Sequence, residues 1–154
     1  MPEPELESEP KLRLTAAEIA AFLADVFPGA MDHFAIEEVR PMHARVRMLF
    51  TEFRLRPGGT ISGPSLMTLA DTGLWVALLA MIGREPLSVT SHLDIDFLRK
   101  PAPADVIAHT VLHKIGRKLA VGDVLMYSAG ESAPCARASV TYAIPSHRLD
   151  PPVD

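Results

Sequence analysis

One stretch decides the fold of this chain: S-G-P-S-L-M-T-L-A-D-T-G-L-W-V-A-L-L-A-M-I-G, residues 62–83. Pro64 suits the first turn of a helix, Ser62 can cap that helix, and Gly83 is a natural stop. From Leu66 to Ile82 almost every residue is apolar or small, so the predicted helix has no solvent face and must be buried on all sides. A membrane span is the rival interpretation, but the run is short and too polar for a lone spanning helix.

Strand-like runs on both sides of this helix supply the sheet that would bury it. Two precede the helix and four follow it, at 34–39, 43–54, 87–98, 106–114, 119–128 and 135–144. From Ser91 to Leu98 apolar and polar residues alternate strictly, as in a strand with one buried face. A second, amphipathic helix is predicted over 15–27. The pattern is α+β: one curved antiparallel sheet wrapped around a long central helix, with an extra N-terminal helix.

Composition and charge exclude several classes of protein. The chain has 154 residues, of which 48% are hydrophobic, so we expect one globular domain over 13–146 with solvated tails at 1–12 and 147–154. Residues 1–10 hold four glutamates and no base, which accounts for the net charge of −4 and leaves a neutral body that is ill suited to nucleic acid. One cysteine and a start without signal-peptide features predict a cytoplasmic protein that does not associate with membranes.

Asp71 is the unexpected residue of the central helix. It lies two turns in, too far from the helix start to cap it, and an unpartnered carboxylate buried among apolar side chains costs several kcal/mol. One interpretation is structural: Thr68, Thr72 or a backbone group satisfies Asp71, or this side of the helix reaches solvent at a subunit boundary. The other is functional: Asp71 faces a cleft and acts as a general base or nucleophile.

The start of the same helix supplies a second candidate group. A glycine-rich loop that opens a helix leaves backbone N–H groups, here around Gly63 and Ser65, suited to a developing oxyanion. Gly63 and Asp71 are about 12 Å apart along the helix, too far to serve one carbonyl in a single chain. Two chains related by a two-fold axis could each lend this loop to the other's aspartate, so the chemistry predicts a dimer.

Four segments carry a resemblance to the hotdog-fold acyl-CoA thioesterases of the PaaI type: G-G-T-I-S-G-P-S-L-M-T-L-A-D-T, P-L-S-V-T-S-H-L-D-I-D-F-L-R-K-P, D-V-I-A-H-T-V-L-H-K-I-G-R-K-L-A-V-G-D-V and A-R-A-S-V-T-Y-A-I-P. The likeness spans roughly residues 33–146, in order and with the family's spacings. It implies a dimer joined through the strand after the central helix, commonly a dimer of dimers. It also implies hydrolysis of acyl-CoA thioesters with no metal or organic cofactor, coenzyme A being part of the substrate.

The resemblance also assigns residues. The family's acidic catalytic residue falls on Asp71, its oxyanion-binding glycine on Gly63, and a hydroxyl that helps to hold the attacking water on Thr90. Where many relatives read H-G-G before the helix, this chain reads S-G-P, so Ser62 takes the place of the histidine and orients the turn without a ring N–H. A slow or unusual substrate is the expectation.

Other residues have competing interpretations. Four cations at two turns could bind the phosphates of coenzyme A or could simply be solvated: Arg99, Lys100, Arg117 and Lys118. Trp75 either packs in the core or lines the acyl pocket. Cys135 is expected to be a buried small hydrophobe. The six histidines show no metal-binding spacing, so no metal site is predicted.

The expected function is hydrolysis of a small or medium acyl- or aryl-CoA thioester, with Asp71 activating water and the amides at the helix start binding the oxyanion. A non-catalytic module or scaffold that binds acyl-CoA is the main alternative, favoured by the missing histidine. Hydratase or dehydratase chemistry is a lesser alternative, because it normally needs a histidine beside the acid and none occurs between 43 and 92.

Overall fold

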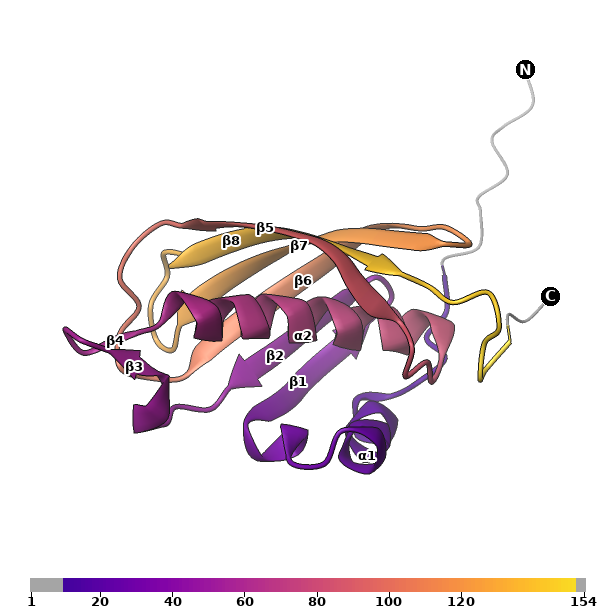
Figure 1. Cartoon of the computed structure of the whole chain (residues 1–154), viewed down its shortest axis with the longest axis horizontal. Helices are drawn as coiled ribbons and strands as arrows, with labels where there is room; N and C mark the ends of the chain where they lie inside the picture. Colours follow the sequence, from indigo (N-terminus) through magenta and orange to yellow (C-terminus); the bar gives the residue numbers. More distant parts are fainter. Residues whose placement is uncertain (1–9, 152–154) are drawn as a thin grey trace, which may run out of the picture.

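A long helix, α2 (Gly63–Ile82), lies along the concave face of a curved antiparallel sheet (Figure 1). The computed structural model describes residues 10–151. Six strands form the sheet in the order β1-β2-β6-β7-β8-β5. Their bounds are β1 (Phe34–Arg40), β2 (His43–Met48), β5 (Val89–Phe97), β6 (Val106–Ile115), β7 (Leu119–Ser128) and β8 (Ala136–Ala143). The predicted sheet wrapped around a central helix is confirmed, as is an N-terminal helix, α1 (Ala16–Val26).

Local sequence explains where the helices begin and end. Thr15 and Glu18 form a capping box in which each side chain accepts from the other's backbone N–H at 3.2 Å. Ser62 caps α2 by accepting from the N–H of Ser65 at 3.3 Å. Gly83 ends α2 with a φ of 92°, in the region that favours glycine. Both helices therefore form where the sequence predicts them.

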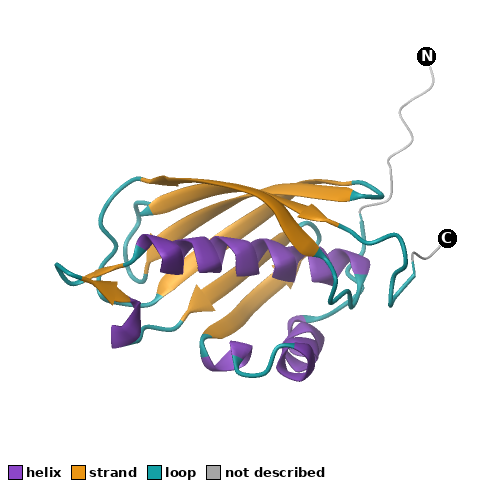
Figure 2. Cartoon of the chain, in the orientation of Figure 1, coloured by secondary structure: helices purple, strands orange, loops and turns teal. Residues whose placement is uncertain are grey.

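The strand predicted over 43–54 is shorter in the structure, where β2 ends at Met48. Asp105 explains the difference, because its Oδ1 accepts from the N–H of Phe50 at 2.7 Å and so gives this backbone group a side-chain partner in place of a strand. Three short elements then lead into α2 (Figure 2): a 3₁₀ turn (Glu52–Arg54), β3 (Leu55–Arg56) and β4 (Thr60–Ile61).

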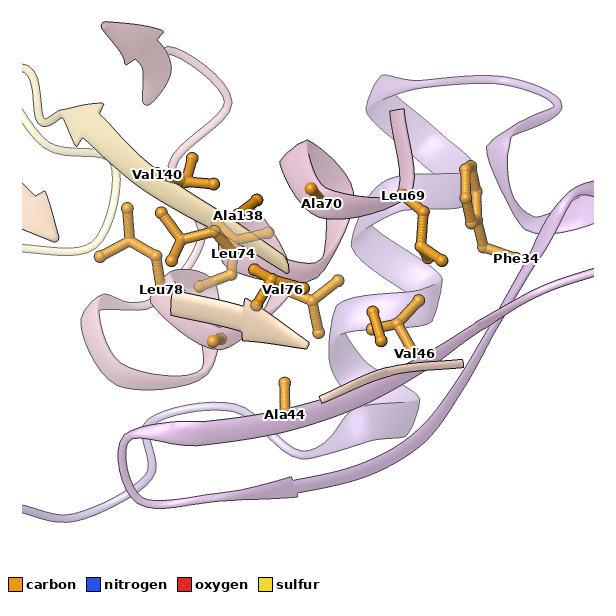
Figure 3. Close-up of a cluster of buried hydrophobic side chains, with 14 of the residues drawn as sticks. Phe34, Ala44, Val46, Leu69, Ala70, Leu74, Val76, Leu78, Ala138 and Val140 are labelled. Atoms are coloured by element: carbon orange, nitrogen blue, oxygen red, sulfur yellow. The ribbon is translucent and has the colours of Figure 1, made fainter. Parts of the chain in front are cut away.

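Inward-facing side chains of the sheet pack on α2 to form the core, part of which is shown in Figure 3. Buried and less buried residues alternate along β6, β7 and β8, so one face of each strand meets the helix. Gly122 leaves space for Leu74 of α2: a Cβ at Gly122 would lie 2.6 Å from Leu74 Cδ1 and 2.6 Å from the carbonyl oxygen of Val111. The missing side chain lets the helix approach the sheet closely.

The prediction that α2 is buried on all sides is wrong for the described chain. One stripe is uncovered along the first half of the helix, where Met67 and Thr68 are exposed and Asp71, Thr72 and Trp75 are half-buried. These residues recur at intervals of three and four, so they share one face of the helix. The sheet curls over the opposite face only. By length and hydropathy α2 could cross a membrane, but 61% of its most apolar window is buried inside the domain.

The C-terminal segment folds back on the domain as far as residue 151. Asp150 accepts from the backbone N–H of Arg84 at 2.7 Å and from its guanidinium at 3.1 Å. The N–H of Leu149 donates to the buried carboxylate of Glu85 at 3.0 Å. These contacts were not foreseen in the prediction of a solvated tail over 147–154. Residues 1–9 and 152–154, which belong to the predicted tails, lie outside the described residues.

Candidate functional site

Asp71 lies in the wall of a cavity of about 480 Å³. The cavity is bounded by the uncovered stripe of α2, by the end of α1 and the residues after it, and by the first residues of β5. Apolar side chains make up most of its wall; they include Leu23, Phe27, Met31, Phe34, Ile36, Val46, Val76 and Val89. A half-buried carboxylate thus faces a space with room for a small ligand.

Two hydroxyl groups hold one oxygen of the Asp71 carboxylate. The hydroxyl of Thr90, a residue of β5, donates to Oδ1. The hydroxyl of Tyr142, a residue of β8, donates to the same oxygen at a distance of 2.7 Å. Thr90 and Tyr142 face each other across the β5–β8 ladder, so the sheet itself sets the position of both donors. In the described chain Oδ2 accepts no hydrogen bond from a protein group, which leaves it able to accept one from a ligand or a water molecule.

The Tyr142 hydroxyl is a donor at all ordinary pH values. Burial of the ring and the negative charge of Asp71 both raise the pKa of Tyr142 far above its usual value, so the phenol keeps its proton. Sequence analysis missed this residue. The available signal was the alternation of β8, where Ala136, Ala138 and Val140 share the inward face with Tyr142, whose hydroxyl must then find a partner in the core.

The start of α2 offers one free amide rather than several. Pro64 has no N–H, the N–H of Ser65 is taken by Ser62, and that of Leu66 by the carbonyl of Ser62. Gly63 therefore carries the one N–H of this first turn without a protein partner among the described residues. The Ser62 hydroxyl also donates to the Ser65 hydroxyl at 3.0 Å, so both serines order the turn.

Gly63 and Asp71 are not brought together within one chain. They are eight residues apart on a continuous helix, which corresponds to about 12 Å. Gly63 instead lies against Phe97, at the far end of β5 from Thr90: a Cβ added to Gly63 would lie 3.2 Å from the Phe97 ring. The two candidate catalytic groups thus sit at opposite ends of the same edge strand.

The four candidate phosphate ligands are divided in the same way. The N–H of Arg99 donates to the carbonyl of Cys135, just before β8, whereas the carbonyl of Lys118 accepts from Ile144, just after β8. Arg99 and Lys100 therefore lie near one end of the sheet, and Arg117 and Lys118 near the other, about 30 Å away. All four side chains are exposed.

Trp75 belongs to the cavity wall as well as to the edge of the core. Its Nε1 is buried and has no hydrogen-bond partner in the described chain, so this N–H is an unsatisfied donor. Cys135 is fully buried, and burial raises the pKa of its thiol, which leaves it unsuited to act as a nucleophile. No cluster of three metal-ligating side chains occurs in the part of the chain that the structure describes.

Comparisons with known proteins agree with this architecture. The sequence profile described as "Thioesterase superfamily" matches residues 58–135. A crystal structure from Silicibacter sp. TM1040, described as a candidate thioesterase, is 41% identical with a TM-score of 0.83 and covers 90% of this chain and 96% of its own. The structure of zebra fish thioesterase superfamily member 2 is 20% identical with a TM-score of 0.75, and the match covers 86% of this chain and 99% of the zebra fish chain.

A third similar structure contains a ligand. It is described as a hypothetical thioesterase protein with coenzyme A from Streptococcus pneumoniae; it is 22% identical with a TM-score of 0.66 and covers 75% of this chain and 90% of its own. No protein of curated function matches the sequence.

Proposed function

Because this chain belongs to the thioesterase superfamily and has its hotdog fold, we propose that it hydrolyses an acyl-CoA thioester with Asp71 as the group that activates water. One observation carries the proposal. Asp71 lies in the wall of an apolar cavity with Oδ1 fixed by Thr90 and Tyr142 and with Oδ2 free of protein donors in the described chain. A carboxylate held in this way presents one defined oxygen to a water molecule.

The proposed reaction balances with water and protein groups alone. Oδ2 of Asp71 takes a proton from water as the water oxygen bonds to the thioester carbonyl carbon, and a backbone N–H stabilises the resulting oxyanion. The carbon–sulfur bond then breaks, and the departing thiolate takes the proton from Asp71, which gives a carboxylic acid and free coenzyme A. In the alternative route Oδ2 attacks the carbonyl carbon itself and the carbon–sulfur bond breaks, which releases coenzyme A as its thiolate and leaves an anhydride. Water then opens the anhydride to give the carboxylic acid and the Asp71 carboxylate, and the proton released passes to the thiolate.

A dimer would bring the oxyanion donor to Asp71. β5 is an edge strand, and Val89 and Phe97 near its two ends are 56% and 54% exposed, which favours pairing with another strand. If two copies pair antiparallel through β5, the start of one strand lies beside the end of the other. Thr90 at the start holds Asp71, and Phe97 at the end contacts Gly63. The partner's Gly63 would then lie near Asp71.

The same pairing would gather the cations. Arg117 and Lys118 lie near the start of β5, and the partner's Arg99 and the partner's Lys100 would arrive at this end of the sheet. Together they would form a basic rim beside the cavity, suited to the phosphates of coenzyme A. We propose a homodimer, or a dimer of dimers, acting in the cytoplasm without a metal or organic cofactor.

Release of free thiol from a panel of aliphatic and aromatic acyl-CoAs tests the function. Asp71→Asn keeps the shape of the side chain and removes its basicity, so kcat should fall by about 10² to 10⁴. Asp25→Asn, on the exposed side of α1, is the matched control and should match wild type. Equal rates for wild type and Asp71→Asn would contradict the mechanism. Saturable binding of coenzyme A with no thiol release from any substrate would favour a non-catalytic acyl-CoA binding module.

A further inference from the structure

A basic hollow of about 520 Å³ lies where the C-terminal segment passes the turn between β6 and β7. Arg117 and Lys118 line it from the turn, and residues 145–148 with Pro151 line it from the C-terminal segment. The segment contributes His147 and Arg148, and none of the lining residues is acidic. Figure 1 shows this segment in yellow, running past the end of the sheet.

The cations that line this basic hollow have no ion-pair partner in the described part of the chain. Of the ion pairs found among residues 10–151, none involves Arg117, Lys118 or Arg148. The described arginines of the sheet, such as Arg45 and Arg47, do have carboxylate partners. Like charges around a space whose lining contains no acid repel one another, so a bound anion would stabilise the arrangement. Planar guanidinium groups suit phosphate in particular.

The C-terminal segment is held in place by groups outside the basic hollow. Its anchors are the Arg84–Asp150 pair and the bond from the N–H of Leu149 to buried Glu85. The guanidinium of Arg13 adds hydrogen bonds to the carbonyls of Asp150 and Pro151 at 3.3 and 2.9 Å. Arg148 therefore enters the basic hollow from a backbone fixed on its C-terminal side, rather than from a free end.

The basic hollow and the Asp71 cavity lie at the same end of the sheet. Ala143 pairs with Leu119 of β7 on one side and with Val89 of β5 on the other. The residues next to this row, Thr90 and Tyr142, hold Asp71. A ligand whose reactive end lies in the cavity could thus extend past the start of β5 into the basic hollow.

We propose that the basic hollow binds the phosphate groups at the nucleotide end of coenzyme A, and that the C-terminal segment supplies Arg148 as one of its ligands. This inference rests on the proposed function, because it needs a thioester carried by a phosphorylated nucleotide. It goes further in making the segment after β8 part of the substrate site.

Titration calorimetry with free coenzyme A, dephospho-coenzyme A and inorganic pyrophosphate tests the proposal without any turnover. Arg148→Gln should raise the Kd for coenzyme A about tenfold, which corresponds to the loss of one charge-assisted contact. Dephospho-coenzyme A lacks the 3′-phosphate but keeps the diphosphate. Weaker binding of dephospho-coenzyme A than of coenzyme A would show that the 3′-phosphate is bound, and equal binding would show that the diphosphate is. Arg40→Gln, at the exposed end of β1, is the control and should bind as wild type does.

Asp150→Asn separates the proposal from general electrostatics. This substitution removes a negative charge near the basic hollow, so simple attraction predicts tighter binding of coenzyme A. If the segment must be anchored to place Arg148, binding weakens instead. Circular dichroism checks that each variant is folded.

Three results would overturn the proposal: no binding of coenzyme A to wild type, equal Kd values for wild type and Arg148→Gln, or tighter binding by Asp150→Asn. Weaker binding by Arg148→Gln in a protein that hydrolyses no thioester would instead support the basic hollow and contradict the proposed function.

Discussion

The Asp71 carboxylate is tolerated in an apolar helix because two other elements satisfy part of it. Thr90 from β5 and Tyr142 from β8 both donate to Oδ1, and the stripe of α2 that carries Asp71 is not covered by the sheet. The two interpretations that the sequence left open are therefore compatible, because the residue belongs to a polar network and also faces a cavity. The predicted side-chain partners were wrong: Thr90 and Tyr142 hold Asp71, whereas the Thr68 hydroxyl donates to the carbonyl of Pro64.

Tyr142→Phe tests the role of the newly found donor. A hydrogen bond to a charged group contributes about 1.5–3 kcal/mol, so its loss should lower kcat by roughly ten- to a hundredfold if Tyr142 fixes Asp71 for the reaction. Steady-state kinetics should show the change in kcat rather than in KM, because the phenol acts on the reaction through its hydrogen bond to Asp71. An unchanged kcat in a folded Tyr142→Phe protein would remove this positioning role.

The pH dependence of the wild-type enzyme follows from the same residue. Because burial and Asp71 raise the pKa of Tyr142, the phenol stays protonated above its ordinary pKa of about 10. The hydrogen bond to Asp71 should therefore persist over the whole range in which the protein is folded. We therefore expect ionisation of Tyr142 to cause no fall in kcat below about pH 10. In this range the pH profiles of wild type and Tyr142→Phe should have the same shape. A loss of that kind would mean that Tyr142 ionises more easily than its surroundings imply.

Cys135 should be inert in the native protein. Its side chain is fully buried, and burial raises the pKa of the thiol, so the reactive thiolate is scarce at neutral pH. A colorimetric thiol reagent should label it slowly or not at all under native conditions and fully in guanidinium chloride. Rapid native labelling accompanied by loss of activity would show that Cys135 is accessible.

Asp71 could be found from sequence, but the hydrogen bond between Tyr142 and Asp71 could not. A carboxylate within an apolar helix is costly to bury, and the sequence alone shows that Asp71 is such a residue. Tyr142 is an ordinary inward residue of a strand, and its meeting with Asp71 depends on the register of β8 against β5. That register includes an irregularity between Thr90 and His92 that alternation alone does not reveal.

At the scale of elements, the close approach of α2 to the sheet depends on Gly122. A methyl group there would press on Leu74 and on the backbone carbonyl of Val111, neither of which can move freely. Gly122→Ala should therefore lower the free energy of unfolding by about 1–3 kcal/mol, measured by urea or thermal unfolding. Ser139→Ala, on the exposed face of β8, serves as control. If both variants unfold alike, the contact is less tight than the distances indicate.

The helices were predicted well because their ends carry explicit signals, and β5 to β8 because turn residues separate them. The segment over 49–54, predicted as strand, was mispredicted for the opposite reason. Its backbone partners come from distant residues, such as Asp105 for Phe50 and His33 for Leu49. Such tertiary contacts override the local preference for strand.

At the scale of the whole molecule, the proposed site needs two chains, and mixing of variants tests this. Gly63→Pro removes the free N–H while keeping a residue that the first helical position tolerates, and Gly63→Ala controls for the added Cβ beside Phe97. Gly63→Pro and Asp71→Asn should each be nearly inactive alone. If they exchange subunits freely, an equal mixture should regain about a quarter of wild-type activity, because half of the dimers carry one intact site.

Mass spectrometry should first show that mixed dimers have formed. If activity does not recover in those mixtures, the oxyanion donor and Asp71 of each site belong to the same chain. The second chain is predicted from the helical distance between Gly63 and Asp71 alone. The sequence did not reveal how β5 serves both groups. This edge strand contacts Asp71 through Thr90 at one end and Gly63 through Phe97 at the other.

The folded-back C-terminal segment has a practical consequence for anyone who purifies or immobilises this protein. An affinity tag fused after Asp154 would begin only three residues beyond Pro151, which lines a space together with arginine and lysine side chains. An acidic linker or a detection epitope rich in aspartate would then compete with the phosphates that we propose bind in this space, and would lower the measured affinity for coenzyme A. Fusions are better made to Met1 and cleaved before assay.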